Sequence, residues 1–494
     1  MKQTLHRVRA DFQPAVEFRP PRLTLQESSL VIGLALVFAT LQAAHLYTSL
    51  SLDTDEGVHA EAGRLMLGGY VPHRDFYLAH MPLFPLLLGG GLWLMGSMYH
   101  VRLASVLINC LTVLPLYVAL RRVAPEWKHA RPAALTAVAF YLTYHEMVYH
   151  DYRAPALRPL VNLCVVLYFA LGTVRTPRTW ISFLQGLLSV TVAMLFLPGV
   201  ANVALISGAL IVMTDQAERR RVARRYVWIG VLTAASVCLY LWVVPGSFHQ
   251  VVVDQLQRPS VPRLWRLTYV LEQREDRFFY VLGTLSLIVA TMSLRGLRTL
   301  SIAMLGMITI SLLVSSNFIL HYPTVAAPAF AFGVFTFAYE MSLLAQSFRR
   351  YATVVVHGVL VLAVGLQAGM VLPSLLEKWE DSNPDERLMI DQLAAAPEPV
   401  LALTPIYAVE AHKRLVRELE AAYMDPPPGK RQFGVEEYLS FGTMACTILL
   451  DEVATRAVPK QVRERWRHDF TVFFENPVGT LLLTRQPHCG AASP

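Results

Sequence analysis

The stretch SLDTDEGVHAEAGRLMLGGYVPHRDFYLAHMP, residues 51–82, lies between two long apolar segments and crowds ionisable side chains together. These residues are Asp53, Asp55, Glu56, His59, Glu61, Arg64, His73, Arg74, Asp75 and His80. Charge next to lipid is costly, so the cluster indicates a functional site, with an ordinary solvated loop as the alternative. Apolar residues recur at near-helical spacing over 56–67, before Gly68 and Gly69. We expect a helix on the membrane surface with the acidic residues at its N-terminal end.

The composition is that of a polytopic membrane protein. Of the 494 residues 54% are hydrophobic and only 16% are charged, whereas soluble domains carry about 25% charged residues. The net charge of +7 comes from short Lys and Arg clusters between apolar segments. This is the positive-inside pattern and not a nucleic-acid-binding face. We therefore expect membrane lipids as partners, and no nucleic acid.

The same charge rule decides the topology of the first segments. Residues 1–27 are basic and should be cytoplasmic. If residues 81–98 spanned the membrane, the basic loop 121–131 would lie outside. Pro82 and Pro85 also disfavour an uninterrupted helix. We therefore expect a re-entrant or juxtamembrane helix over 81–98, on the outer side.

The remaining segments alternate regularly with basic loops. The loop 215–225, which holds five Arg residues, is the strongest cytoplasmic marker. We expect about eleven spans, near 28–47, 101–120, 132–149, 155–174, 180–196, 198–214, 226–244, 277–294, 299–320, 324–343 and 352–373. The chain then divides into a cytoplasmic segment (1–27), a transmembrane domain (28–376) with its first outer loop at 48–100, and an extracytoplasmic domain (377–494).

The C-terminal domain has the pattern of a small α/β fold. Strands are predicted over 400–404 and 447–451, helices over 407–423 and 459–468, a linker at 426–428, and a hairpin of 471–475 with 480–484. Of the five cysteines only Cys446 and Cys489 lie in polar sequence, and they can form a disulfide if the domain is extracytoplasmic. We find no nucleotide loop or nucleophile motif here, so a cap or acceptor-recognition role is expected.

Four polar places share the expected outer face: the first loop, 150–153, 245–276 and 321–322. Singly, each is explained by a helix cap, an interfacial histidine or a solvated arginine. Together, the carboxylates of Asp55 and Asp151 offer a base for an acceptor hydroxyl. Arg258 and His321 offer cationic donors for a leaving phosphate. This combination suits transfer from a lipid-linked phospho-sugar.

The outer loops also resemble those of C-type (GT-C) glycosyltransferases that use polyprenyl-phosphate sugars, such as protein O-mannosyltransferases and aminoarabinose transferase. The similar positions are Asp55-Glu56, Ala60-Glu61, Arg64 to Leu67, Pro82, Asp151, Gln257-Arg258 and His321-Tyr322. The resemblance implies a GT-C-like fold. It also implies Asp55 as general base, with Glu56 beside it. The substrate-binding residues it implies are Asp151, Arg153, Arg258, His321, Tyr322, His80 and Arg64.

Two departures leave the sugar and acceptor open. Met81 stands where the aminoarabinose transferase has a lysine, so donor-phosphate contact there falls to His80. Leu197-Pro198-Gly199 replaces a lysine often found between the fifth and sixth spans. The expected reaction is inverting transfer to a hydroxyl of a lipid, glycan or protein.

Other functions are weighed against this one. A transporter or flippase of a lipid-linked intermediate would place ionisable residues at mid-membrane, whereas the charge here gathers at the rim. A non-catalytic scaffold would need no acidic cluster. No cofactor is required by these residues, although Asp53 and Asp55 could hold a divalent metal through oxygen ligands.

Overall fold

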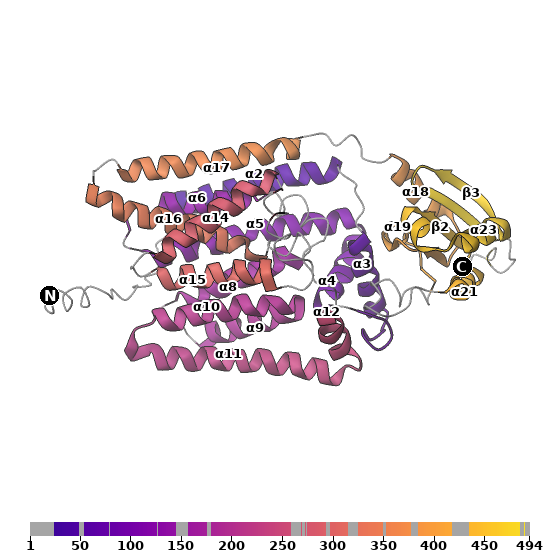
Figure 1. Cartoon of the computed structure of the whole chain (residues 1–494), viewed down its shortest axis with the longest axis horizontal. Helices are drawn as coiled ribbons and strands as arrows, with labels where there is room; N and C mark the ends of the chain where they lie inside the picture. Colours follow the sequence, from indigo (N-terminus) through magenta and orange to yellow (C-terminus); the bar gives the residue numbers. More distant parts are fainter. Residues whose placement is uncertain are drawn as a thin grey trace.

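The computed structural model describes most of the chain. The described residues are 24–48, 54–78, 80–125, 127–144, 157–174, 179–257, 268, 272, 274–292, 297–314, 325–348, 352–376, 384–416, 434–484 and 489. They form a bundle of long helices and a smaller C-terminal domain at one end of it (Figure 1).

Eleven described helices lie at the positions of the eleven predicted spans. They are α2 (Leu25–Thr48), α5 (Met98–Val123), α6 (Ala130–Leu142), α8 (Leu157–Gly172), α9 (Thr179–Leu195), α10 (Val200–Met213), α11 (Gln216–Val243), α14 (Arg274–Met292), α15 (Arg298–Thr309), α16 (Ala327–Phe348) and α17 (Ala352–Leu376). Within α2, α5, α11 and α17, four stretches are long and apolar enough to cross a membrane. A membrane protein is thus confirmed, while the count of eleven spans stays a prediction.

Two helices lie at the end of the bundle that faces the C-terminal domain. These are α3 (Thr54–Leu67), which runs across the bundle axis, and α4 (Leu83–Met95) (Figure 1). With 13 residues, α4 is too short to count among the four candidate spans. Its length fits the juxtamembrane helix predicted over 81–98, and its compartment stays a prediction.

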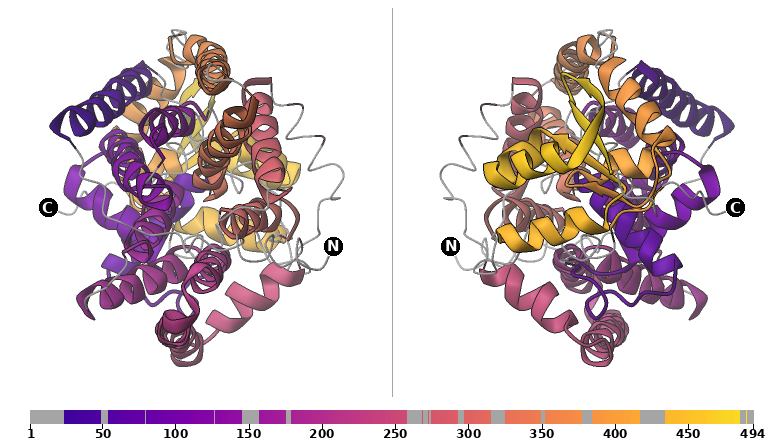
Figure 2. Two further views of the ribbon diagram at one scale, coloured as in Figure 1. Left: turned by 90° about the vertical axis from the view of Figure 1, so that its left-hand side faces the viewer. Right: turned by 90° about the vertical axis from the view of Figure 1, so that its right-hand side faces the viewer.

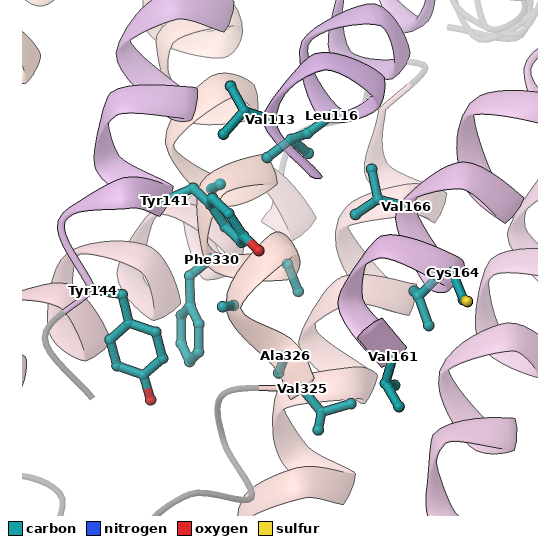
Figure 3. Packing of buried hydrophobic residues seen from close by; sticks show 14 of the residues in the cluster. Val113, Leu116, Tyr141, Tyr144, Val161, Cys164, Val166, Val325, Ala326 and Phe330 are labelled. Atoms are coloured by element: carbon teal, nitrogen blue, oxygen red, sulfur yellow. The ribbon is translucent and has the colours of Figure 1, made fainter. Parts of the chain in front are cut away.

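The bundle is held by aromatic packing and close helix contacts. Phe279 of α14 stacks on Phe140 and on Tyr144, each with ring centroids 4.3 Å apart. Tyr144, Tyr141 and Phe330 lie together in the core (Figure 3). α14 and α16 cross at Gly283 and Gly333, where a Cβ on Gly333 would come within 2.6 Å of the Gly283 carbonyl oxygen. Small residues let membrane helices approach this closely.

Basic residues gather at the other end of the bundle. The N-terminal end of α11, with its arginines, and the C-terminal end of α5, with Arg121 and Arg122, point away from α3 and the C-terminal domain (Figure 1). Glu27 of α2 accepts a hydrogen bond there from the Tyr117 hydroxyl at 3.0 Å and forms an ion pair with Arg131 at 2.9 Å. The positive-inside pattern predicts that this basic end is the cytoplasmic one, and its compartment stays a prediction.

The C-terminal domain has a four-stranded mixed sheet in the order β1-β2-β4-β3. The strands are β1 (Val400–Ala402), β2 (Thr447–Asp451), β3 (Phe470–Asn476) and β4 (Gly479–Thr484), with β1 parallel to β2 and the other pairs antiparallel. Its described helices are α18 (Pro384–Ala395), α19 (Pro405–Glu410), α21 (Val435–Met444), α22 (Glu452–Ala457) and α23 (Lys460–Asp469). Seen end-on, the sheet covers the end of the bundle (Figure 2, right). The small α/β fold, the hairpin and the helix near 459–468 are confirmed.

The helix predicted over 407–423 is correct only for residues 407–410, which belong to α19, and is wrong for residues 411–416. α19 stops at Glu410, because His412 adopts a left-handed conformation with φ of 54°. Lys413 N–H then donates to the Ala408 carbonyl at 2.8 Å, which is the closing bond of a Schellman motif. The chain continues beside β1, where Val416 N–H donates to the Val400 carbonyl at 2.8 Å. Residues 417–433 lie outside the described residues.

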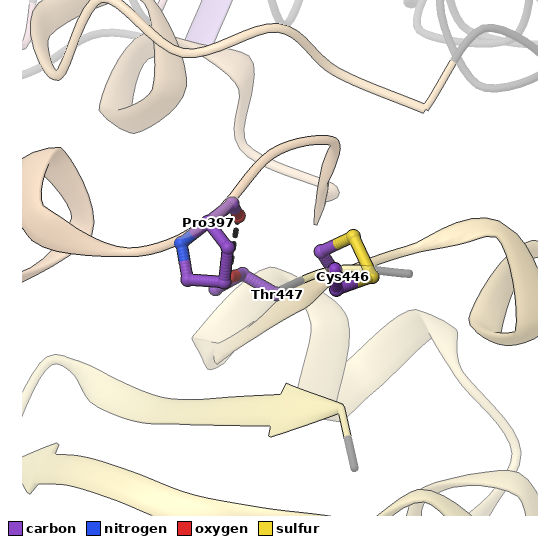
Figure 4. Close-up of a disulfide and its surroundings, with 4 residues drawn as sticks. Pro397, Cys446 and Thr447 are labelled. Carbon is purple, nitrogen blue, oxygen red and sulfur yellow. Dashed lines mark hydrogen bonds between the residues drawn. A yellow bond between two sulfur atoms is a disulfide. The ribbon is translucent and has the colours of Figure 1, made fainter. Parts of the chain in front are cut away.

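The predicted cysteine pair is present as a disulfide. Cys446 and Cys489 are bonded with their Cα atoms 5.4 Å apart, and the bond links residues 43 positions apart in the sequence (Figure 4). Beside it, the Thr447 hydroxyl donates to the Pro397 carbonyl at 2.8 Å. The bond ties the region after β4 to the start of β2.

Cys489→Ser should therefore destabilise the C-terminal domain. Opening a loop of this length costs about 2–5 kcal/mol of unfolding free energy. Limited proteolysis of the purified protein should show faster cleavage after residue 384, and reductant should do the same to the unmodified chain. Cys238→Ser, which replaces an exposed free thiol, is the control. Equal cleavage of both variants would contradict a stabilising role.

Candidate active site at helix α3

Helix α3 confirms the helix predicted after the acidic residues. It covers Thr54–Leu67 and ends at Gly68, and Gly69 then turns with φ of 91°. We expected its apolar side to face the membrane, but protein covers that side instead. Ala62 and Leu65 are buried against Phe76 and Leu78 of the following loop. α3 is therefore an integral part of the fold.

Glycines bring α3 into backbone contact with two neighbours. A Cβ on Gly63 would come within 2.1 Å of the Pro85 carbonyl oxygen of α4, and one on Gly89 would clash with Gly63 in return. A Cβ on Gly57 would lie 2.3 Å from the backbone nitrogen of Ile406 in α19. The helix is thus held between α4 and the C-terminal domain.

A buried ion pair joins the first turn of α3 to α5. Arg102 donates from Nε to Glu56 Oε1 at 2.9 Å, and a second hydrogen bond runs from its terminal nitrogen to the other carboxylate oxygen. Glu56 is 0% and Arg102 3% exposed. Two-point pairing of this kind fixes both side chains. It sets the orientation of the turn that contains Asp55.

A second carboxylate, from the C-terminal domain, lies near this pair. Glu410, at the end of α19, is close enough to Arg102 and to the backbone N–H of Met98 for both to favour its charged form. Burial raises the pKa of Glu410 above its ordinary value, although Arg102, His412 and the Met98 N–H oppose the rise. The Arg102 guanidinium pairs with Glu56 and, at longer range, attracts the charge of Glu410 from a distant part of the chain.

A second polar cluster lies on another side of α3. The His59 ring centroid is 5.2 Å from that of His80 and 4.8 Å from that of Phe84. Burial, then the nearby charges of His80 and Arg158, hold the pKa of His59 well below its ordinary value. Its buried Nδ1 has no hydrogen-bond partner among the described residues. Two imidazoles and a guanidinium so placed can donate hydrogen bonds to an anion.

The loop after α3 is held by hydrogen bonds of its own. Gln250, in the π-helical turn His249–Val253 after α11, accepts from the Leu78 N–H at 2.9 Å and donates to the His73 carbonyl at 2.9 Å. Arg74 donates to its neighbour Asp75 at 2.8 Å. His73, Arg74 and Asp75 are therefore explained as structural parts of this loop.

The structure describes only some of the predicted site residues. His80 joins the cluster with His59, and the exposed Arg64 donates at 2.8 Å to Glu61, which is itself buried. Asp55 is described as part of α3 without its side chain. The predicted residues outside the described ranges are Asp53, Asp151, Arg153, Arg258, His321 and Tyr322. Among described residues no group of three or more His, Cys, Asp or Glu suits a metal ion, so a metal at Asp53 and Asp55 stays a prediction.

Four residues near α3 were not predicted: His59 as a neighbour of His80, Arg102, Arg158 and Glu410. Arg102 carries a signal, because an arginine at the start of an apolar span needs a buried partner. Arg158 similarly begins the apolar segment of α8. Glu410 carries none, since its place near Arg102 depends on how the C-terminal domain docks.

Comparison with known proteins identifies the fold. No protein-family model matches the chain, and no curated protein sequence does. The structure of ArnT from Cupriavidus metallidurans in the apo state matches with 15% identity and a TM-score of 0.63, over 92% of this chain and 98% of ArnT. ArnT bound to undecaprenyl phosphate matches with 14% identity and the same TM-score, over 93% and 98%. The expected likeness to C-type glycosyltransferases is confirmed for the fold.

Removing Arg102 should be strongly destabilising. Arg102→Met leaves the buried Glu56 carboxylate without its partner, which costs about 3–5 kcal/mol. The melting temperature of this variant in detergent should be much lower than that of the parent. The double variant Glu56→Gln with Arg102→Met should recover much of it. Arg74→Met, at an exposed pair, should melt like the parent; equal losses in both single variants would contradict the role of the buried pair.

Glu410→Gln should change how stability depends on pH. Because the folded-state pKa of Glu410 is raised, the protonated form favours folding, and this contribution is lost as pH rises through the folded pKa. At pH 7 the glutamine variant should melt higher than the parent. At pH 4 the difference should shrink, since the parent carboxyl is then largely protonated. If the difference in melting temperature between variant and parent were the same at all pH values, the raised pKa would be contradicted.

Proposed function

We propose that this chain, which has the fold of a C-type glycosyltransferase, moves a sugar from a polyprenyl phosphate to an acceptor hydroxyl. The acceptor is a lipid, a glycan or a protein, and the reaction inverts the configuration at the anomeric carbon. The cluster of His59, His80 and Arg158 beside the first turns of α3 carries this proposal. A neighbour of the same fold has been observed with undecaprenyl phosphate, which is consistent with a lipid-linked phosphate here.

Asp55 is assigned as the general base. It precedes His59 by four residues, so the two positions lie on the same side of α3. An acceptor hydroxyl deprotonated at Asp55 would attack the sugar while the phosphate leaves toward the cationic cluster. A phosphate dianion there would also oppose the burial and the neighbouring positive charges that hold the pKa of His59 below its ordinary value.

The other predicted residues take supporting roles. Arg258, His321 and Tyr322 are assigned to the donor phosphate, and Asp151 and Arg153 to the substrate. Glu56 is assigned to positioning, because its carboxylate is engaged by Arg102. It holds the turn from which Asp55 acts.

The site and the C-terminal domain are assigned to the extracytoplasmic side of a multi-pass protein. The basic helix ends lie at the opposite end of the bundle (Figure 1). The Cys446–Cys489 disulfide also suits an oxidising compartment.

Asp55→Asn should abolish most turnover while the donor still binds. The substitution keeps the size of the side chain and removes the base, for an expected loss of about 10²- to 10⁴-fold in kcat. Purified protein with a panel of polyprenyl-phosphate sugars provides the assay, with donor binding measured separately. Asp75→Asn is the matched control in the same loop. Normal turnover in Asp55→Asn, or full loss in Asp53→Asn instead, would move the base or a metal to Asp53.

A further inference from the structure

An apolar groove lies between α10 and α11, and no residue of α3 lines it. It has a volume of about 500 Å³ and is floored by Tyr168 of α8 and Ser189 of α9, within the range of roughly 300–1,000 Å³ that ligand sites occupy. Along α10 it extends from Val200 to Ile211, roughly 16 Å at about 1.5 Å per residue. This equals about half of a ~30 Å hydrocarbon core. The groove thus has the length of one leaflet.

The mouth of the groove opens sideways between the two helices. Gly208 of α10 and Gly230 of α11 line it and are exposed. The α11 surface beside it carries exposed Trp228, Val231 and Leu232. Since α11 is apolar enough to span a membrane, the mouth faces hydrocarbon.

The polar groups along the groove already have partners. The Tyr168 hydroxyl lies 2.6 Å from that of Ser207, and the Ser189 hydroxyl 2.7 Å from that of Thr233. What remains is mostly aliphatic surface. A hydrocarbon chain fits such a lining better than a polar ligand.

One end of the groove is strongly basic. Tyr226 lines it, and the Arg225 guanidinium carbon stands 5.4 Å from the centre of the Tyr226 ring. Arg225 bonds Gln185, yet its buried Nε has no partner in the part of the chain that the structure describes. Four further arginines lie just before it in the N-terminal turns of α11, at positions 219, 220, 221 and 224. An anionic headgroup would be attracted to this end.

We propose that this groove binds an anionic phospholipid from the leaflet at the basic end of the bundle. One acyl chain lies between α10 and α11, and the phosphate pairs with Arg225. The polyprenyl donor is a different ligand, since its phosphate is assigned to the α3 end of the bundle (Figure 1). The proposal does not depend on the transfer reaction.

Filling the groove tests the proposal. A Cβ at Gly208 or Gly230 would meet no atom within 4 Å, so Gly208→Leu with Gly230→Leu places new side chains in the groove without a clash. Gly358→Leu with Gly365→Leu, equally open positions on α17, is the control. The probe is phosphatidylglycerol, compared with phosphatidylcholine, added to delipidated protein and counted by native mass spectrometry.

The unmodified chain and the α17 control should retain one phosphatidylglycerol at least tenfold better than phosphatidylcholine. The groove variant should lose this molecule, and Arg225→Gln should keep a lipid but lose the preference for the anionic one. Equal retention of both lipids by the unmodified chain would overturn the proposal. So would unchanged retention in the groove variant, or displacement of phosphatidylglycerol by equimolar undecaprenyl phosphate.

Discussion

The ion pair of Glu56 with Arg102 is the contact on which the arrangement at α3 depends. A fully buried carboxylate is tolerated only when a partner compensates its lost hydration, and the partner here comes from a bundle helix. The C-terminal domain packs beside the same turn, where Gly57 lies against Ile406, and Glu410 lies within electrostatic range of Arg102. Three parts of the chain therefore come together around the first turns of α3.

Close backbone contacts complete this arrangement. Gly63 against α4 and Gly57 against α19 leave no space for a side chain on those two sides of α3. For a general base, a fixed position matters more than high basicity, because small displacements of the reacting groups lower the rate strongly. The packing of α3 therefore serves the proposed chemistry, while the anionic-lipid groove occupies a part of the bundle that this packing does not reach.

Local pattern was sufficient for most of the elements. The positions of the bundle helices, the end of α3 at Gly68, the short α4 and the hairpin from β3 to β4 follow from hydrophobic runs, glycines and charge. The end of α19 did not follow, because the left-handed turn at His412 carries no local sequence signal and leads to the pairing of Val416 with the distant Val400. Arg158 beside His59 and Glu410 beside Arg102 are equally non-local. Such contacts leave no trace in a short window of sequence.

The contact of Gly57 with Ile406 also affects the order in which parts of the protein can fold during synthesis. The two residues are separated by roughly 350 positions, which a ribosome making about 5–20 residues per second covers in some tens of seconds. Throughout that interval α3 has been made but the α19 surface that covers it has not. The bundle helices up to α17 can therefore assemble around a site that the C-terminal domain covers only after residue 406 has been made.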